Sequence, residues 1–443
     1  LSLKAGFNSA RLHQKVFEES PSPHVDANLR ARMTAAAVGL AEQIGYQSAG
    51  TVEFLLDADS GAFYFLEVNA RIQVEHPVTE LVTGVDLVAW QLAIAQGWPL
   101  PLRQADIHFA GHAIEARLCA EDPSDAYRPQ AGEVALWRPA HGEGVRVDHG
   151  LLARDRISQH YDSLVAKVIA WGDDRATALA RLDGAVRATV FLGPICNRAH
   201  LLEVISHPVF AVGNATTAFL VDHPPRGDEP AASDNDLIAA ALWRHGGGLR
   251  RRFRNNPYRG DVTVLALPGR GGDAVVHVVL EARGGDEITW GVDRDPDPSL
   301  WRKPRASSVV TLADRQDDSV CFVRDGVRLT YEVGQLGADL FVQRRRGRVV
   351  RLVELSLLPE RGVAAVAEGV LTASSAATVA IVHVVLGERV AEDDALVTLE
   401  AMKMLTVVRA PRAGVVVAVH VAVTETVAAG ATLIELDADG DHG

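Results

Sequence analysis

A regular alternation of polar and apolar residues marks residues 66–80, LEVNARIQVEHPVTE. Because successive side chains of a strand point to opposite faces, an extended chain would have one apolar face and one polar face here. The apolar face would carry Val68, Ala70, Ile72 and Val74, and the polar face Glu67, Asn69, Arg71, Gln73 and Glu75. The pattern predicts a strand over residues 62–75, and its polar side is dense in groups that can bind or react.

Hydrophobic patterns also predict the neighbouring elements. Apolar residues at mixed three- and four-residue spacing predict helices over residues 24–46, 84–97 and 173–190, the last capped by Asp173 or Asp174. TVEFLLDA (51–58) predicts a strand, and the turn signal DADSG joins it to the strand at 62–75 as a hairpin. The region 108–170 alternates short strand patterns with Gly and Pro turns.

The second half of the chain has a different sequence pattern, which is rich in short β-strand signals. PPRGDEPAASDND (224–236) is rich in Pro, Gly and Asp and predicts a domain boundary. Residues 258–358 show short β-rich segments that predict a small sheet or barrel. VHVVLGERVAEDDALVTLE (382–400) overlays VHVAVTETVAAGATLIELD (419–437) at an offset of 37 residues. The repeat predicts a quasi-symmetric β-sandwich with EAMKM (400–404) at a hairpin tip.

Composition narrows the class of protein. The 443 residues are 48% hydrophobic and 23% charged, with a formal net charge of -13, which suits a soluble protein of two to four domains and disfavours a nucleic-acid binder. The three cysteines are scattered and show no zinc spacing. The apolar runs are too short to span a bilayer as a helix. We expect a cytoplasmic protein without a membrane partner.

The hairpin predicts a metal site. If the turn is centred on Ser60, Glu53 lies opposite Glu67, and like charges in directly opposed positions repel. A Mg²⁺ ion between the carboxylates would remove that repulsion, and Asn69 on the same face would add a neutral oxygen. The alternative is a solvated hairpin face. The metal interpretation is favoured because AFYFLEV (62–68) looks like a buried strand.

Three further polar residues follow on the same predicted face. Arg71 has the shape to hold a small planar oxyanion through two parallel hydrogen bonds. Glu75 beside it could accept a proton, and Gln73 lies between them. The group therefore suits a reaction between a metal-bound nucleotide and a small oxyanion. The alternative is an ion pair between Arg71 and Glu75 that fixes the end of the strand.

Longer motifs resemble a known family. They are EVNARIQVEHPVTE (67–80), HQKVFEESPSP (13–23), GHAIEARLCAEDP (111–123), GVRVDH (144–149) and YDSLVAKVIAWG (161–172), all of which resemble biotin carboxylase. EAMKM resembles the biotinyl-lysine site of biotin carboxyl carrier domains. Together they resemble the α-subunit of a biotin-dependent acyl-CoA carboxylase, most closely the 3-methylcrotonyl-CoA type.

The resemblance implies an α+β multidomain fold. Its parts would be the C-terminal part of an ATP-grasp domain (1–105), a biotin carboxylase C-terminal domain (106–223), a linker (224–236), a β-rich subunit-contact domain (237–365) and a lipoyl-like β-sandwich biotinyl carrier domain (366–443). The family's N-terminal domain and its lid with a Gly-rich loop have no counterpart here. We therefore expect a truncated chain that does not carboxylate biotin alone.

The resemblance also assigns roles to individual residues. Glu53, Glu67 and Asn69 match the Mg²⁺ (or Mn²⁺) and ATP site. Arg71, Gln73, Val74 and Glu75 match the bicarbonate site, with Glu75 as general base. Lys15 matches a lysine near bicarbonate and the transferred phosphate, His13 a phosphate-side histidine, and Arg146 the arginine that stabilises the biotin enolate. Lys403, between Met402 and Met404, matches the lysine that carries biotin; the alternative is an unmodified surface lysine.

These roles imply a ligase. Bicarbonate and ATP would give carboxyphosphate, and biotin on Lys403 would carry the carboxyl group to an acyl-CoA bound by a carboxyltransferase β-subunit. The implied partners are that β-subunit, in a hetero-oligomer, and a biotin protein ligase. Acetyl-, propionyl-, 3-methylcrotonyl- and geranyl-CoA stay open as substrates, whereas pyruvate and urea carboxylases are disfavoured.

Some motifs depart from the family pattern, and rival interpretations follow. Ala10 and Leu12 replace a glutamine and an arginine, ASSAA (373–377) replaces a Pro–Met–Pro–Gly turn, and Thr424 replaces a glycine. A second hypothesis is therefore a non-catalytic module that accepts biotin and docks a partner without ATP chemistry. A third, an ATP-grasp ligase unrelated to biotin, is disfavoured by EAMKM.

Overall fold

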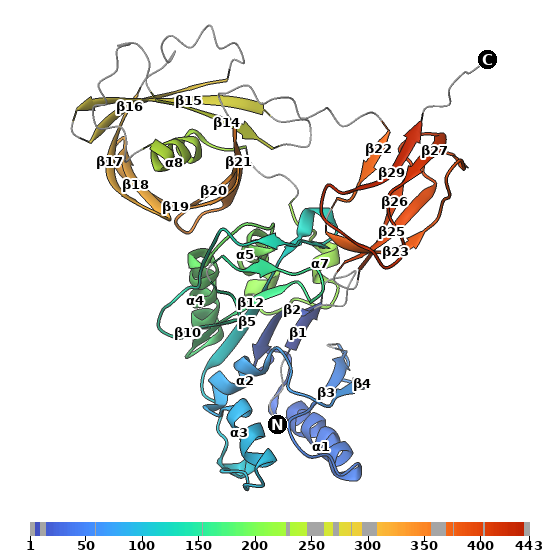
Figure 1. The fold of residues 1–443 in the computed structure, drawn as a ribbon. Coiled ribbons are helices and arrows are strands. Elements are labelled where there is room, and N and C mark those ends of the chain that lie inside the picture. The colour runs from blue at the N-terminus through green and yellow to red at the C-terminus, as the bar shows by residue number, and fades with distance from the viewer. Residues whose placement is uncertain are drawn as a thin grey trace.

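Five antiparallel strands form the central sheet of the first half of the chain (Figure 1). In spatial order they are β1 (Ala5–Asn8), β2 (Lys15–Ser20), β5 (His112–Cys119), β12 (Leu164–Gly172) and β10 (Val145–His149). The computed structural model describes residues 5–8, 15–57, 59–152, 154–226, 231–245, 261–268, 274–284, 286–294, 308–355, 369–374, 376–401 and 404–437.

Helices and small sheets cover the central sheet. Helix α4 (Arg175–Ala188) begins at Asp174, whose carboxylate accepts a hydrogen bond from Thr177 N at 2.7 Å, as predicted. Phe17, Ile114 and Leu182 are among the fully buried residues of the core between them. The other elements are α5 (Arg198–Ser206), α6 (Pro208–Ala211), α7 (Phe219–Asp222), η1 (Gln104–Asp106), η2 (Pro123–Asp125), β6 (Glu121–Asp122), β7 (Arg128–Pro129), β8 (Gly132–Glu133), β9 (Leu136–Arg138), β11 (Arg156–Ile157) and β13 (Val190–Leu192).

The predicted hairpin is present but shorter than predicted. It consists of β3 (Thr51–Leu56) and β4 (Phe63–Asn69) and lies beside helix α1 (Ala27–Gln43) (Figure 1). The prediction of a strand up to residue 75 was wrong, because the chain leaves the strand after Asn69 and enters helix α2 (His76–Thr83). Pro77 in the first turn of that helix suits a helix start.

The expectation that AFYFLEV is buried was also wrong. Tyr64, Phe65 and Leu66 are 59%, 56% and 54% exposed. Helix α3 (Leu87–Ala95) follows α2, and the predicted helix at 84–97 contains it. Among the described residues, no single helix has the length and apolarity to cross a membrane; α2 and α3 pass that test only as a pair bent by 98°.

A closed barrel follows, as the β-rich pattern predicted. Its strands are β14 (Asp261–Leu267), β15 (Ala274–Gly284), β16 (Glu287–Asp293), β17 (Ser308–Gln316), β18 (Ser319–Arg324), β19 (Val327–Leu336), β20 (Asp339–Arg344) and β21 (Val349–Leu355). Helix α8 (Asp234–His245) lies inside the ring of strands (Figure 1). The sequence analysis missed this helix, whose first turn overlaps the predicted linker at 224–236.

The barrel packs directly on the first half of the chain. Val190 and Leu192 of β13 share a small buried cluster with Phe341 of β20. Arg138 of β9 pairs with Glu332 at 2.6 Å and with Asp318 at 2.7 Å. Apolar contact and ion pairs together therefore hold the barrel against the central sheet's domain.

The terminal segment forms the predicted quasi-symmetric sandwich. One sheet holds β22 (Val370–Thr372), β29 (Thr432–Asp437), β27 (Gly414–Val419) and β24 (Arg389–Val390), and the other β26 (Met404–Arg409), β25 (Ala395–Ala401), β23 (Ala377–Val382) and β28 (Thr426–Val427). The offset of 37 residues carries β23 onto β27 and β24 onto β28. Ala401 pairs with Met404 across the predicted EAMKM hairpin.

Candidate functional site

Two glutamates face each other across the β3–β4 hairpin. Glu53 pairs with Glu67 in the antiparallel register, and Thr51 pairs with Asn69. The predicted opposition of Glu53 and Glu67 is therefore confirmed. The amide nitrogen of Asn69 donates to Glu67 Oε1 at 2.8 Å and to Glu53 Oε1 at 3.3 Å. Asn69 thus lies between the two carboxylates, where a cation would lie.

The residues at the hairpin suit Mg²⁺. Two carboxylates and a neutral amide leave further coordination positions for phosphate oxygens and water, which is how proteins usually hold this ion. A half-turn of the Asn69 amide would bring its oxygen to the carboxylates. Within the described residues no group of three His, Cys, Asp or Glu side chains forms a metal cage. The arrangement thus favours a cation that arrives with a nucleotide.

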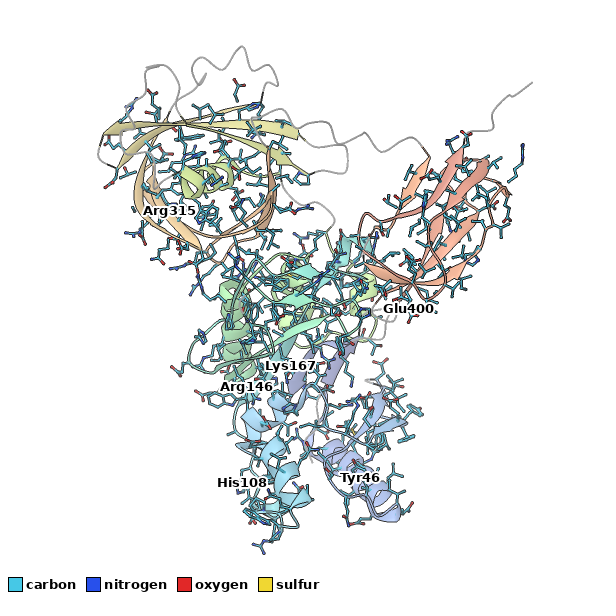
Figure 2. The ribbon with its side chains drawn as sticks, in the orientation of Figure 1. Tyr46, His108, Arg146, Lys167, Arg315 and Glu400 are labelled. Carbon is cyan, nitrogen blue, oxygen red and sulfur yellow. The ribbon has the colours of Figure 1, made fainter. Side chains whose placement is uncertain are left out.

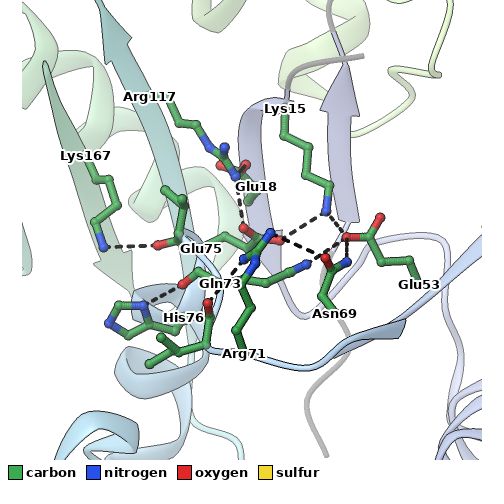
Figure 3. Close-up of polar contacts among 12 residues, drawn as sticks. Lys15, Glu18, Glu53, Asn69, Arg71, Gln73, Glu75, His76, Arg117 and Lys167 are labelled. Atoms are coloured by element: carbon green, nitrogen blue, oxygen red, sulfur yellow. Dashed lines mark hydrogen bonds and ion pairs between the residues drawn. The ribbon is translucent and has the colours of Figure 1, made fainter. Parts of the chain in front are cut away.

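Lys15 connects the hairpin to Glu75. Its ammonium donates to Glu53 Oε1 at 2.6 Å and to Glu75 Oε1 at 3.2 Å (Figure 3). Burial opposes the charge of Lys15, but Glu75 and Glu53 outweigh it and raise its pKa. Burial likewise opposes the charge of Glu53, but hydrogen bonds from Lys15 and Gln73 keep its pKa low. Both groups are therefore charged at neutral pH.

Arg117 is the main residue that sequence reasoning missed. One guanidinium nitrogen of Arg117 lies 2.9 Å from Glu75 Oε2 and 2.5 Å from Glu18 Oε1. Burial disfavours the charge of Arg117, but Glu18 and Glu75 raise its pKa. The available signal was EAR within GHAIEARLCAEDP: in a strand, Glu115 and Arg117 share one face.

A cavity of about 570 Å³ joins these groups. Its lining includes Lys15, Glu53, Leu66, Glu67, Asn69, Arg71, Gln73, Val74, Glu75 and Arg117. Gln73 donates to Glu53 Oε1 at 2.8 Å, whereas its buried Oε1 has no hydrogen-bond partner among the residues that the structure describes. A buried oxygen without a hydrogen bond is destabilising unless a ligand or a water molecule donates to it. The Oε1 atom of Gln73 can therefore accept a hydrogen bond from a ligand in the cavity.

Arg71 and Glu75 do not sit on one strand face. The guanidinium of Arg71 donates to Asn69 Oδ1 at 3.3 Å and to Ile72 O at 3.2 Å, and the side chain is exposed. Glu75 is 4% exposed and pairs with Lys15 and Arg117. The alternative was an ion pair between Arg71 and Glu75 that fixes the end of a strand. That alternative is wrong, because the strand ends at Asn69 and does not continue to Glu75.

Arg146 does not line this cavity. It forms a two-bond pair with Asp148 at 2.7 and 2.8 Å and also donates to Glu80 at 2.7 Å. The hydrogen bonds that Arg146 donates to Asp148 are the largest cause that raises the pKa of Arg146. Figure 2 places Arg146 and Lys167 on neighbouring strands, and Lys167 donates to the carbonyl oxygen of Val74 at 3.0 Å.

Some predicted residues lie outside the described part of the chain. They are His13, Met402 and Lys403, and the side chain of Met404 is likewise not described. The hairpin that carries Lys403 is described on both sides, because Glu400 pairs with Leu405 and Ala401 with Met404. The position of the predicted biotinyl lysine at a hairpin tip thus stays a prediction.

Three family models match the chain in order. Residues 6–103 match the ATP-binding domain of the carbamoyl-phosphate synthase L chain, 115–222 the biotin carboxylase C-terminal domain, and 363–436 the biotin-requiring enzyme domain. The chain therefore combines C-terminal parts of a biotin carboxylase with a biotin–lipoyl domain, and the predicted fold class is confirmed. These matched domains support biotin and ATP as cofactors, and Mg²⁺ accompanies ATP in phosphoryl transfer.

Two similar relatives are named as α-subunits of acyl-CoA carboxylases. The chain is 35% identical over 442 residues to the propionyl-CoA carboxylase α chain of Ruegeria pomeroyi, covering 91% of this chain and 63% of the relative. It is 42% identical over 244 residues to the mitochondrial methylcrotonoyl-CoA carboxylase subunit α of Arabidopsis thaliana, covering 54% and 33%. The chain thus spans between a third and under two thirds of these relatives' lengths.

A solved structure agrees with the first half of the chain. It is the biotin carboxylase domain of a thermophilic 2-oxoglutarate carboxylase bound to bicarbonate, with a TM-score of 0.50 and 37% identity. The match covers 52% of this chain and 51% of that one.

Proposed function

We propose that this chain supplies residues for the carboxylation of biotin with bicarbonate and ATP and then carries the carboxyl group on Lys403 to a carboxyltransferase subunit. The observation that carries the proposal is the single cavity that joins an opposed carboxylate pair to a buried glutamate between two cations. Phosphoryl transfer needs positioned charge of this kind at both ends of the reacting group. The separate carrier domain supplies the lysine that biotin needs.

Each residue of the cavity has a distinct task in this proposal. Glu53, Glu67 and Asn69 would hold the magnesium of Mg–ATP, which supplies charge neutralisation when bound. Arg71, the Gln73 side chain and the backbone at Val74 would hold bicarbonate. Glu75 would accept the bicarbonate proton while Lys15 faces the transferred phosphate. Burial of Glu75 keeps water from competing for that proton.

Arg117 is the better candidate for the residue that stabilises the biotin enolate. A stabilising cation must lie beside the developing negative charge, and Arg117 lines the cavity beside Glu75 whereas Arg146 is held by Asp148 and Glu80. We therefore assign that role to Arg117. Arg146 would act as a structural residue of the neighbouring strand.

The partners follow from the relatives. The two relatives are named as an α-subunit and an α chain. These names support a hetero-oligomer with a carboxyltransferase β-subunit. That subunit would bind the acyl-CoA, with methylcrotonoyl- and propionyl-CoA as the substrates that the relatives favour. A biotin protein ligase would modify Lys403. The barrel at 261–355 would serve as the subunit-contact domain, within the predicted limits 237–365.

A second candidate function is a biotin-accepting docking module without ATP chemistry. The specific observation in its favour is the exposure of Tyr64, Phe65 and Leu66 on β4, the strand that carries Glu67. Exposed apolar surface beside a site marks a place where another protein segment binds. In this case the chain would accept biotin and dock its partner, and the cavity residues would carry out no ATP chemistry.

One preparation distinguishes the two candidates. The full chain is produced with a biotin ligase, and streptavidin binding and bicarbonate-dependent ADP formation with Mg–ATP are measured. We expect labelling that Lys403→Arg abolishes and Lys303→Arg leaves unchanged. Turnover that Glu75→Gln abolishes would support the first function. Labelling without turnover would show that this chain does not carboxylate biotin alone, as the sequence predicts, and would favour the second function. Labelling of Lys403→Arg would refute both.

A further inference from the structure

Two buried glutamates lie side by side behind the cavity. Glu18 of β2 and Glu115 of β5 are paired directly in the antiparallel register. Their exposed fractions are 1% and 0%. Directly opposed side chains have Cβ atoms about 4.5–5.5 Å apart, so the two carboxyl groups share one buried space. None of the roles proposed above uses either residue.

The hydrogen bonding of this pair is incomplete. Among the described residues, neither carboxyl oxygen of Glu115 and only one of Glu18 has a polar partner. Glu18 has an ion pair, because a nitrogen of Arg117 lies 2.5 Å from its Oε1. Buried polar atoms are almost always satisfied in proteins, and a shared proton would satisfy one oxygen of each residue at once.

The surrounding cations do not neutralise both carboxylates. Arg117 is divided between Glu18 and Glu75, and Lys15 between Glu53 and Glu75. Lys167 of β12 donates to Val74 O and pairs with Asp148 at 3.1 Å. On helix α2, His76 bonds Gln73 O, and Glu80 bonds Leu87 N and Arg146. Every nearby cation therefore already has another anion or acceptor.

Burial and mutual repulsion act in the same direction. Desolvation raises the pKa of Glu18 to about 7, although Arg117 opposes the shift. Desolvation and the charge of Glu18 raise the pKa of Glu115 well above its ordinary value. Two carboxylates that share a site cannot both ionise without a large cost. Among the described residues no ion pair reaches the oxygens of Glu115, so Glu115 is the residue that keeps the proton.

We propose that Glu18 and Glu115 hold one proton between them at neutral pH, with Glu115 neutral and Glu18 charged, and that Glu18 thereby positions Arg117 against Glu75. Glu18 and Glu115 are positioning residues that act through Arg117. The catalytic meaning of the pair rests on the proposed function. The shared proton itself is a property of the folded chain and does not depend on ATP, biotin or bicarbonate.

The test is infrared spectroscopy of the full chain, without substrates, across pH 5–9. We expect wild type to show a protonated-carboxyl band at pH 7, where an ordinary glutamate is almost fully ionised. Glu115→Gln, which mimics the neutral form, should remove one carboxyl from that band and remain folded. Glu121→Gln is the matched control at a second buried glutamate, with its own raised pKa, and should leave the Glu115 band in place.

Two outcomes would overturn the proposal. One is a wild-type pH 7 spectrum to which Glu115 and Glu18 contribute no protonated carboxyl, as shown by unchanged difference spectra for Glu115→Gln and Glu18→Gln. The other is a protonated-carboxyl band at pH 7 that keeps its full intensity when both Glu18 and Glu115 are replaced by glutamine. If Glu115→Gln does not fold, the pH titration of wild type tests the proposal instead. The protonated-carboxyl band must then decrease only as the pH rises through about 7 and above. Failure of ATP turnover would leave these results intact and would count only against the proposed function.

Discussion

The internal repeat of the terminal sandwich allows a stability prediction with a built-in control. Thr424 has a backbone φ of +72°, and Gly387, its counterpart 37 residues earlier, has a φ of +84°. Thr424 N donates to Val379 O and Gly387 N to Val416 O, each at 2.8 Å. The two turns are therefore equivalent in backbone geometry, but only one has the residue that suits it.

The magnitude follows from the backbone alone. A left-handed conformation costs an L residue roughly 1–2 kcal/mol, with β-branched residues among the least tolerant. Replacement by glycine offsets about 0.5–1 kcal/mol of this gain in stability, because glycine loses more backbone freedom on folding. Thr424→Gly should therefore stabilise the terminal domain by about 1 kcal/mol. Gly387→Thr should destabilise it by a similar amount, because a Cβ added at Gly387 meets no atom within 4 Å.

Hydrogen exchange of the full chain measures this effect locally, since one unfolding free energy is not defined for several domains. In peptides that cover 414–437, we expect Thr424→Gly to slow exchange about fivefold and Gly387→Thr to accelerate it about fivefold, which is the ratio for about 1 kcal/mol. The double variant should lie near wild type. A change in the same direction for both single variants would refute the backbone argument.

Two further predictions concern the metal site and the barrel. Glu67→Gln should weaken Mn²⁺ binding in the presence of ADP by about tenfold or more, because one of the two opposed carboxylates is lost. Electron paramagnetic resonance of the full chain measures the Mn²⁺ affinity, with the exposed Asp59→Asn as the control. Equal Mn²⁺ affinity of wild type and Glu67→Gln would count against an ion shared by the two glutamates. Gly334→Val should weaken the contact between the barrel and the first half of the chain, because a Cβ at Gly334 lies 2.9 Å from the Cβ of Ala135. We expect faster hydrogen exchange in residues 339–344 and 190–192. Unchanged exchange in both segments would contradict this prediction.

The sequence was informative where local pattern determined the structure. Alternation and a turn signal predicted the β3–β4 hairpin, and the register between Glu53 and Glu67 agreed with the prediction because that end of the ladder is regular. The bulge between Glu53 and Phe54 shifts the register only toward the turn. The repeat likewise predicted the sandwich, because two equal β-units can close on each other without any long-range information.

The sequence misled where tertiary position determined the outcome. Period-two alternation continues to Glu75, yet the strand ends at Asn69, and an irregular segment at 70–75 leads into the helix that begins at His76. Burial of Tyr64 could not be judged from its neighbours, because exposure depends on what covers the sheet. Helix α8 is buried from Leu237 to Leu242 inside the barrel, so it lacks the amphipathic stripe by which surface helices are recognised.

The choice between Arg117 and Arg146 yields the last prediction. Arg117→Met would leave Glu18 buried and unpaired, which costs about 3–5 kcal/mol for an ionised group. Arg146→Met should cost only about 1 kcal/mol, because the Arg146 side chain is 35% exposed and Asp148 keeps Lys167 at 3.1 Å. Hydrogen exchange of β2 and β5 in the full chain compares the two variants.

The pH dependence of the difference tests its cause. The pKa of Glu18 is raised to about 7 in the folded chain, and loss of Arg117 raises it further because an opposite charge is removed. At pH 8 the Arg117→Met variant must keep a buried charge or take up a proton at a cost, whereas near pH 5 Glu18 is neutral and needs no cation. The destabilisation by Arg117→Met should therefore shrink as pH falls from 8 to 5, while that of Arg146→Met stays nearly constant. Parallel pH profiles for the two variants would show that Arg117 does not compensate a charge on Glu18.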